Sequence, residues 1–179
     1  MAISRLPQDR WSWAEINQGA LRRNTRAFKN LLNPRQRLCC VVKADAYGHG
    51  AVACAKIMYA TGADMFAVAT VKEGVELREG GIVSPILLLS EPPAESIDLL
   101  LEHDIMPSVY TFEFALAYGE RASQLGKIGK YHMVIETGMN RIGVHYADVI
   151  EFRRSIHFHR GIQCDGVFTH FATADEQGG

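Results

Sequence analysis

The sequence predicts an α/β fold of the (β/α)8 barrel type that is incomplete, with about six βα units in 179 residues. Short apolar runs of strand length alternate with stretches of helical periodicity, an order typical of parallel strands joined by right-handed crossovers. This alternation also permits an open, doubly wound sheet. A barrel is favoured because three residues that could take part in catalysis lie at or just after the carboxyl ends of strands. Barrel enzymes have their active sites at that end of the strands. These residues are Lys43, Arg141 and His170.

The expected strands are apolar and have the length of buried strands. They cover residues 38–43, 65–69, 86–89, 105–110, 131–136 and 162–170. Helices are expected where apolar residues recur at a spacing of three and four. They cover residues 17–32, 51–60, 71–79, 92–102, 112–125 and 147–158. Pro34, Gly62 and Gly80 stop the first three helices, and Thr111 caps the fifth.

Composition and charge are ordinary for a globular domain, since 47% of the residues are hydrophobic, 22% are charged and the formal net charge is -1. There is no basic stripe or acidic tail, which argues against nucleic-acid and membrane-surface binding. The apolar runs are strand-sized and residues 1–7 lack a signal-peptide core, so we expect a cytoplasmic protein without a membrane partner. The cysteines lack metal-like spacing with one another or with histidine, so we expect no metal.

Residues 41–50 are the most informative segment, because a lysine there ends an apolar strand and a glycine-rich stretch with a tyrosine follows. At the mouth of a buried strand the Lys43 amine is partly desolvated, which suits a Schiff-base amine. Tyr47 offers a hydroxyl, and a helix beginning near Ala51 can receive a phosphate. A reactive lysine beside a phosphate seat suggests pyridoxal 5'-phosphate (PLP). On position alone, a strand-end lysine reaching out to water is the alternative.

Three segments, in order along the chain, resemble motifs of the alanine racemases, PLP enzymes of fold-type III. Residues 41–50 resemble the cofactor-lysine motif of that family. Residues 136–143 resemble its T-G-M-x-R-x-G segment, and residues 166–175 its strand-end T-H-F-x-x-A-D segment. The resemblance runs along essentially the whole chain. It implies a PLP-binding barrel that carries a second, β-rich domain.

The resemblance also implies roles for four residues. Lys43 would hold PLP covalently and, once freed, act as the base that serves the D-enantiomer. The Tyr47 hydroxyl would reach the phosphate, and His170 would lie against the PLP ring. Arg141 would contact both the phenolic oxygen of PLP and the substrate carboxylate. From the residue types alone, the last three could instead be a packed tyrosine, a surface arginine and a core histidine.

One position departs from the family pattern. Many members carry a lysine two residues before the acidic residue of the T-G-M segment, and a carbamate on that lysine steadies the arginine. Here this position is Val134, two residues before Glu136. The carbamate cannot form, so Glu136 or an anion would have to position Arg141.

By the same resemblance, residues 1–16 look like the strand that joins the β-rich domain, and residues 17–179 like a partial PLP-binding barrel. A barrel needs eight strands, so we interpret the chain as the N-terminal half of such an enzyme, without the C-terminal β-rich domain. The second base, a tyrosine donated across a dimer, is expected beyond Gly179. An open sheet would leave edges that are either covered by something else or a source of marginal stability.

The expected function is PLP-dependent interconversion of L-alanine and D-alanine, which supplies D-alanine for cell-wall peptidoglycan. We expect a homodimer in the full-length form and no activity from the isolated fragment. The alternatives are a PLP-barrel decarboxylase and a non-catalytic PLP-binding module. The sequence does not distinguish alanine from serine or a broader range of side chains.

Overall fold

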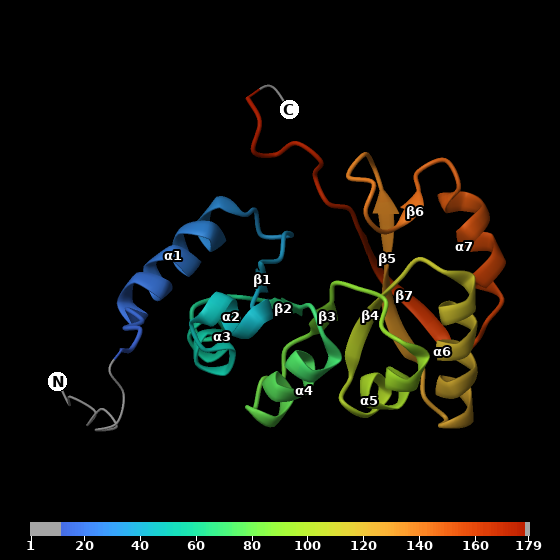
Figure 1. Cartoon of the computed structure of the whole chain (residues 1–179), viewed down its shortest axis with the longest axis horizontal. Helices are drawn as coiled ribbons and strands as arrows, with labels where there is room; N and C mark the ends of the chain where they lie inside the picture. Colours follow the sequence, from blue (N-terminus) through green and yellow to red (C-terminus); the bar gives the residue numbers. More distant parts are fainter. Residues whose placement is uncertain (1–11, 178–179) are drawn as a thin grey trace.

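The computed structural model describes residues 12–177, and its centre is one parallel sheet of seven strands (Figure 1). The strand order is β1-β2-β3-β4-β5, with β6 and β7 both paired to β5. The strands are β1 (Cys39–Val41), β2 (Met65–Val68), β3 (Ile86–Leu88), β4 (Ile105–Val109), β5 (Gly129–Glu136), β6 (Val144–His145) and β7 (Ile162–Phe168). Every pairing is parallel, as the predicted βα alternation requires.

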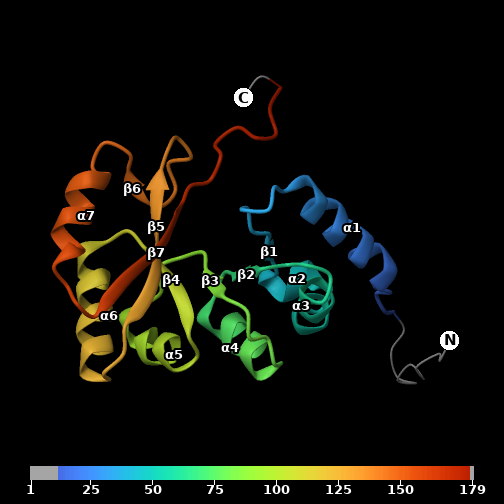
Figure 2. The same cartoon turned by 180° about the vertical axis from the view of Figure 1, so that it is seen from behind.

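Helices connect the strands and flank the sheet (Figure 2). They are α1 (Gln18–Leu31), α2 (Lys43–Gly48), α3 (Ala51–Tyr59), α4 (Val71–Glu79), a 3-10 turn (Ala94–Ser96), α5 (Ile97–Glu102), α6 (Phe112–Gln124) and α7 (Val149–His157). The predicted order of strands and helices is confirmed. Thr111 caps α6 as expected, because its Oγ1 accepts the N–H of Phe114 at 3.3 Å.

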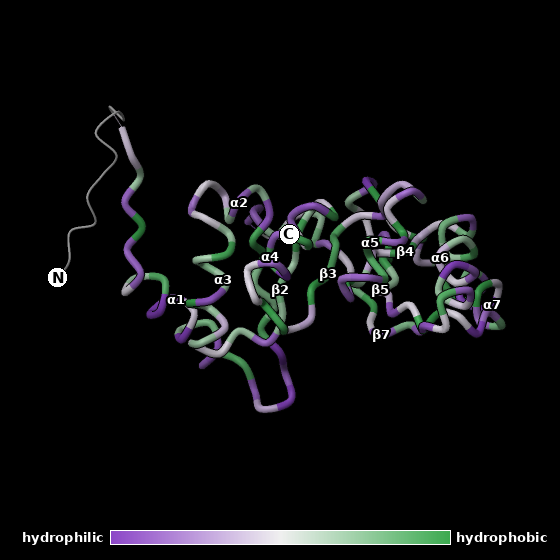
Figure 3. The backbone as a smooth tube through the Cα atoms, turned by 90° about the horizontal axis from the view of Figure 1, so that it is seen from below, coloured by the Kyte–Doolittle hydropathy of each residue, from purple (hydrophilic) through white to green (hydrophobic). Residues whose placement is uncertain are grey.

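Side chains alternate between two faces of the sheet, since successive residues of a strand point in opposite directions. On β2, Phe66 joins the main core under the helices, whereas Ala67 lies in a second, smaller cluster. On β3, Ile86 and Leu87 divide in the same way. The smaller cluster occupies the face that a closed barrel would turn inward. Seen from below, apolar stretches follow the strands (Figure 3).

The sheet is open in the part of the chain that the structure describes. There, β1 pairs with β2 alone and β7 pairs with β5 alone. Of the segment compared above with a joining strand, residues 1–11 lie outside the described part, and residues 12–17 form neither helix nor strand. Among residues 12–177, no helix is both long and apolar enough to cross a membrane.

Two elements differ from the prediction. The structure has seven strands where six were expected, because β6 pairs with the end of β5. Two residues are too short a run to produce an alternating pattern, so β6 had no signal in the sequence. The second difference is α2, which occupies part of the segment that was read as a loop after Lys43.

Candidate functional site

A cavity of about 530 Å³ lies at the carboxyl ends of β1, β2, β3, β5 and β7. The four site residues expected from the sequence all line it: Lys43, Tyr47, Arg141 and His170. They come from three segments far apart in the chain. The common edge of a parallel sheet brings these segments together, as the barrel prediction required.

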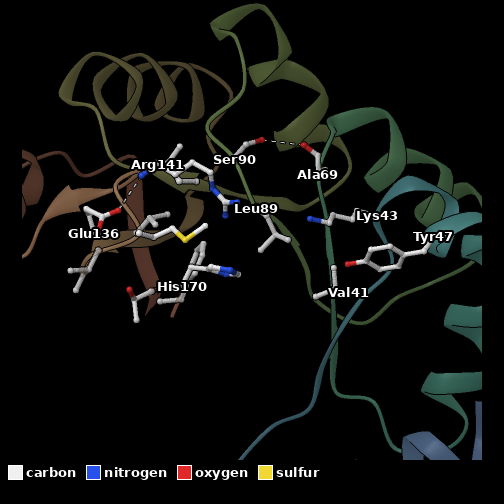
Figure 4. A pocket seen from close by; sticks show the side chains of 15 residues that line it. Val41, Lys43, Tyr47, Ala69, Leu89, Ser90, Glu136, Arg141 and His170 are labelled. Atoms are coloured by element: carbon white, nitrogen blue, oxygen red, sulfur yellow. Dashed lines mark hydrogen bonds between the residues drawn. The ribbon is translucent and has the colours of Figure 1, made fainter. Parts of the chain in front are cut away.

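The four side chains stand on two sides of this cavity (Figure 4). Lys43 and Tyr47 belong to α2 on one side, with the half-buried Lys43 amine directed into the space. Arg141 and His170 stand opposite, after β5 and β7. Leu89 lies between the two sides and adds an apolar surface. The cavity therefore combines an amine, a phenol, a guanidinium and an imidazole around apolar side chains.

The turn that carries Lys43 and Tyr47 is left-handed. Ala44, Asp45, Ala46 and Tyr47 have φ of 51°, 53°, 53° and 56°. Left-handed helical backbone costs L-residues about 1–2 kcal/mol each, and consecutive residues of this kind are rare outside glycine. Such a turn needs contacts from elsewhere to hold it.

One side chain within the turn and one just after it supply some of those contacts. Asp45 Oδ1 accepts the N–H of Ala51 at 2.6 Å, which ties the turn to the start of α3. The Nδ1–H of His49 donates to the carbonyls of Ala46 at 2.9 Å and Tyr47 at 3.1 Å. His49 thus acts on the backbone of the turn. These bonds hold Lys43 and Tyr47 on the same side of the cavity.

The expected phosphate seat at the start of the following helix is not found at this cavity. The N–H of Ala51, the first residue of α3, is already bonded to Asp45. Of the described residues that line the cavity, none belongs to α3. The sequence suggested a loop leading straight into a helix, and it carried no sign of the left-handed turn. Because of that turn, α2 presents the Tyr47 side chain to the cavity.

The loop that carries Arg141 is organised by Glu136. The Glu136 carboxylate accepts the backbone N–H of Gly138, and that of Arg141 at 3.3 Å. Backbone N–H groups, that of Asn140 foremost and that of Gly138 next, lower the pKa of Glu136 below its ordinary value. Glu136 therefore holds the main chain of Arg141. In residues 12–177, no carboxylate lies within 4.0 Å of the guanidinium itself.

Val134 and His170 lie at opposite extremes of burial at the cavity. Val134 is buried and gives the cavity an apolar wall. His170 is exposed, so the alternative of a core histidine is wrong. Just before it, the hydroxyls of Thr169 and Thr137 lie 2.6 Å apart and join the ends of β7 and β5. Among the described residues, no group of three or more His, Cys, Asp or Glu side chains could hold a metal ion.

Glu73 is a residue near the site that the sequence analysis did not single out. It lies on α4 and its carboxylate bonds to the N–H of Ala44, the residue after Lys43. The pattern Thr70-x-x-Glu73 indicates a helix cap, and that cap is present. The contact with Ala44 depends on how β1 and β2 are placed, which local sequence does not reveal.

Comparisons with known proteins agree with this arrangement. The model of the alanine racemase N-terminal domain matches residues 16–178. Alanine racemase from Carboxydothermus hydrogenoformans is 44% identical over 165 residues, which cover 92% of this chain and 44% of that protein. Alanine racemase from Clostridium novyi is 42% identical over 166 residues, which cover 92% of this chain and 43% of that protein.

Solved structures show the same likeness. Alanine racemase from Bacillus anthracis with bound L-Ala-P superimposes with a TM-score of 0.86 at 34% identity, covering 96% of this chain and 44% of that one. Histidine racemase from Leuconostoc mesenteroides gives a TM-score of 0.81 at 28% identity, and the match covers 88% of this chain and 42% of that one. The chain thus spans less than half the length of these relatives. On the match along residues 16–178, it belongs to the alanine racemase N-terminal domain family.

Proposed function

We propose that this chain forms the PLP-binding barrel part of an amino-acid racemase that interconverts L-alanine and D-alanine. The observation that carries the proposal is the convergence of Lys43, Tyr47, Arg141 and His170 on one cavity at the carboxyl edge of the sheet. The alanine racemases among its relatives support alanine as the substrate. In the division that we propose, residues 17–179 belong to the barrel and residues 1–16 to the segment joining the β-rich domain.

The chemistry of the cavity fits PLP. A cavity of about 530 Å³ is within the usual range for small-molecule sites. The Lys43 amine suits the aldehyde carbon, and the Tyr47 hydroxyl suits the phosphate. The Arg141 guanidinium suits the phenolic oxygen, and the His170 ring can lie against the pyridine. We therefore assign cofactor binding to these four residues.

The proposed mechanism gives each residue a separate task. When bound to the substrate amine, PLP supplies an acceptor for the electrons that are left when Cα loses its proton. The free Lys43 amine removes the Cα proton of D-alanine from one face, and when L-alanine is the substrate the protonated amine delivers a proton to that same face. Arg141 holds the substrate carboxylate and so sets which face of Cα is presented to Lys43. Apolar neighbours such as Leu89 reduce the contact of the amine with water.

Other features of the proposal rest on the family resemblance. The second base is a tyrosine outside these residues, supplied across a homodimer. The protein acts in the cytoplasm, and its product enters cell-wall synthesis as D-alanine. Because Glu136 holds the main chain of Arg141 and not its guanidinium, we propose that an anion, the bound substrate carboxylate, steadies this side chain.

The decisive experiment traps the cofactor. Adding PLP to the chain should produce an absorbance band near the edge of the visible range, and borohydride should remove the band and leave a modified Lys43. Lys43→Ala should abolish the trapped adduct. Lys72→Ala is the matched control, because Lys72 is exposed on α4 and pairs only loosely with Glu76 at 3.9 Å. An adduct that persists in Lys43→Ala contradicts the assignment.

Activity assays separate racemisation from the alternatives. The chain is mixed with the part of an alanine racemase relative that lies beyond the matched region, and D-alanine formation is measured. Release of carbon dioxide would identify a decarboxylase, and PLP binding without turnover would identify a binding module. Histidine is tested beside alanine, because a histidine racemase shares this fold.

A further inference from the structure

The carboxylate of Glu73 bonds to backbone at the ends of two strands beside the cavity. Its Oε1 accepts the N–H of Ala44 at 2.8 Å. Its Oε2 accepts the N–H of Ala69 at 2.8 Å and that of Thr70 at 3.1 Å. Ala44 directly follows Lys43, and Ala69 lines the cavity after β2. One side chain thus joins the end of β1 to the end of β2.

Helix capping explains only half of this arrangement. In the capping box of α4, Thr70 Oγ1 accepts the N–H of Glu73, and Glu73 Oε2 accepts the N–H of Thr70. The remaining oxygen, Oε1, reaches a segment 29 residues earlier in the chain. A cap needs no such contact, since both of its bonds are made without Oε1.

The N–H of Ala44, to which Glu73 Oε1 is bonded, lies where the backbone passes from the end of β1 into the left-handed turn. Val42 still makes a sheet-like bond, from its N–H to the carbonyl of Ala67 at 2.9 Å. Ala44 is the first left-handed residue, with φ 51°. Because the peptide between Lys43 and Ala44 is planar, holding the direction of this N–H restrains the orientation of that peptide. The backbone of Lys43, from which its side chain leaves, is restrained with it.

We propose that Glu73 is a positioning residue for Lys43, which it holds through the Ala44 N–H at the start of the left-handed turn. The inference rests on the proposed function, in which Lys43 is the amine that bonds PLP. Glu73 is not among the residues that line the cavity, so it acts through the backbone. A carboxylate suits the task, because its two oxygens accept from N–H groups on two strands at once.

The test uses Glu73→Gln, which keeps the size of the side chain but replaces one accepting oxygen by an NH2 group. The one remaining carbonyl oxygen should stay with the N–H groups of Ala69 and Thr70, which give it two bonds, so that the NH2 group faces Ala44 and the bond to the Ala44 N–H is lost. The rate at which Lys43 is trapped by PLP and borohydride should fall about tenfold, the scale of one lost hydrogen bond to a charged group. An unchanged rate would reduce Glu73 to a helix cap and overturn the proposal.

Two matched variants on the same helix separate positioning from stability. Thr70→Ala removes the Oγ1 bond of the cap and leaves the Glu73 carboxylate in place. It should lower the unfolding temperature and keep the trapping rate within about twofold. Glu76→Gln removes a carboxylate that, among the described residues, pairs with exposed Lys72 alone, and it should change neither quantity. A tenfold slower rate in Thr70→Ala would show that helix stability alone controls trapping, and would contradict positioning.

A second measurement decides the inference without PLP. Hydrogen exchange of the Ala44 amide in the free chain should be faster in Glu73→Gln than in the two control variants. If the unaltered chain shows no trapping at Lys43, the proposed function fails, and the exchange rate still reports whether Glu73 holds the turn. Equal exchange of Ala44 in all four proteins would refute the bond on which the inference depends.

Discussion

Glu136 illustrates how a single carboxylate can order a loop through bonds to backbone N–H groups. The sequence left open whether Glu136 or an anion replaces the missing carbamate beside Arg141. The structure shows Glu136 bonded to backbone N–H groups of the loop, including that of Arg141 at 3.3 Å. Each of these bonds favours the charged carboxylate, which is why the pKa of Glu136 is lowered. The order of the loop therefore depends on the charge of this group.

The pH dependence of the loop follows from that lowered pKa. A carboxyl group with a depressed pKa in the folded state stabilises the fold fully above its ordinary value, which is 4.5 here. This stabilisation is lost as the pH falls below 4.5 through the lower pKa of the folded state. The amide resonances of Gly138 and Arg141, followed by NMR from neutral to acid pH, should shift together in that window.

Two variants test this assignment. In Glu136→Gln the amide chemical shifts of Gly138 and Arg141 should not change through the acid range, because residue 136 then has no carboxylate to protonate. Glu151→Gln, on an exposed position of α7, should titrate like the unaltered chain. A transition of Gly138 and Arg141 at or above pH 4.5 would mean that the carboxylate is not the group that holds the loop.

At the residue level, the motif segments were sufficient to select the four side chains that meet at the cavity. They were not sufficient for Glu73, whose contact with Ala44 crosses from α4 to the end of β1. A short-range pattern identifies a cap, because the partners of a cap are three residues apart. It cannot identify a partner that only the pairing of two strands brings near.

Among the elements, the long periodic ones were predictable and the short ones were not. Strands such as β4 and helices such as α6 carry apolar patterns that identify their type, and Thr111 marks the start of α6. The two-residue β6 has no such pattern. The left-handed turn of α2 has no local signal either, because the residues Ala44–Tyr47 include no glycine and are held by Glu73, His49 and Asp45.

A close contact between α6 and the start of β7 depends on Gly161. A Cβ on Gly161 would lie 2.1 Å from the carbonyl oxygen of Gly119 and 2.4 Å from the Ser123 hydroxyl. Backbone cannot move aside as a flexible side chain can, so α6 would have to shift away from β7. We expect Gly161→Ala to lower the free energy of unfolding by about 1–3 kcal/mol, the usual cost of overpacking.

Urea unfolding followed by circular dichroism measures this change. The neighbouring Arg160→Ala introduces the same side chain on an exposed residue and should change stability by no more than about 0.5 kcal/mol. If Gly161→Ala is as stable as Arg160→Ala, the approach of α6 to β7 is looser than the structure shows.

For the whole molecule, the sequence predicted parallel βα units and an incomplete barrel, and the open sheet agrees with both. In the described part, β1 and β7 each pair on one side only. What covers those edges is not encoded in local patterns, because an edge strand and a central strand of a parallel sheet are both apolar runs. The open arrangement has a chemical consequence, since the cavity at the strand ends is less shielded from water than in a closed barrel.

The last prediction concerns the 179-residue polypeptide itself. Inverting a stereocentre requires proton removal on one face of Cα and return on the other. Within residues 1–179 the proposed function names a single base, Lys43. With PLP present, we therefore expect solvent deuterium to enter D-alanine at Cα, while L-alanine stays inert and neither enantiomer is converted. Incubating each enantiomer in deuterated water, with mass and chiral analysis of the product, measures both events.

Lys43→Ala is the control for this exchange, because it should abolish deuterium uptake by D-alanine. Rapid interconversion of the two enantiomers would place a second base within residues 1–179 and refute the division of labour proposed here. Exchange into L-alanine alone would instead place the Lys43 amine on the opposite face of Cα. The two enantiomers thus report directly on which side of the substrate the left-handed turn delivers its lysine.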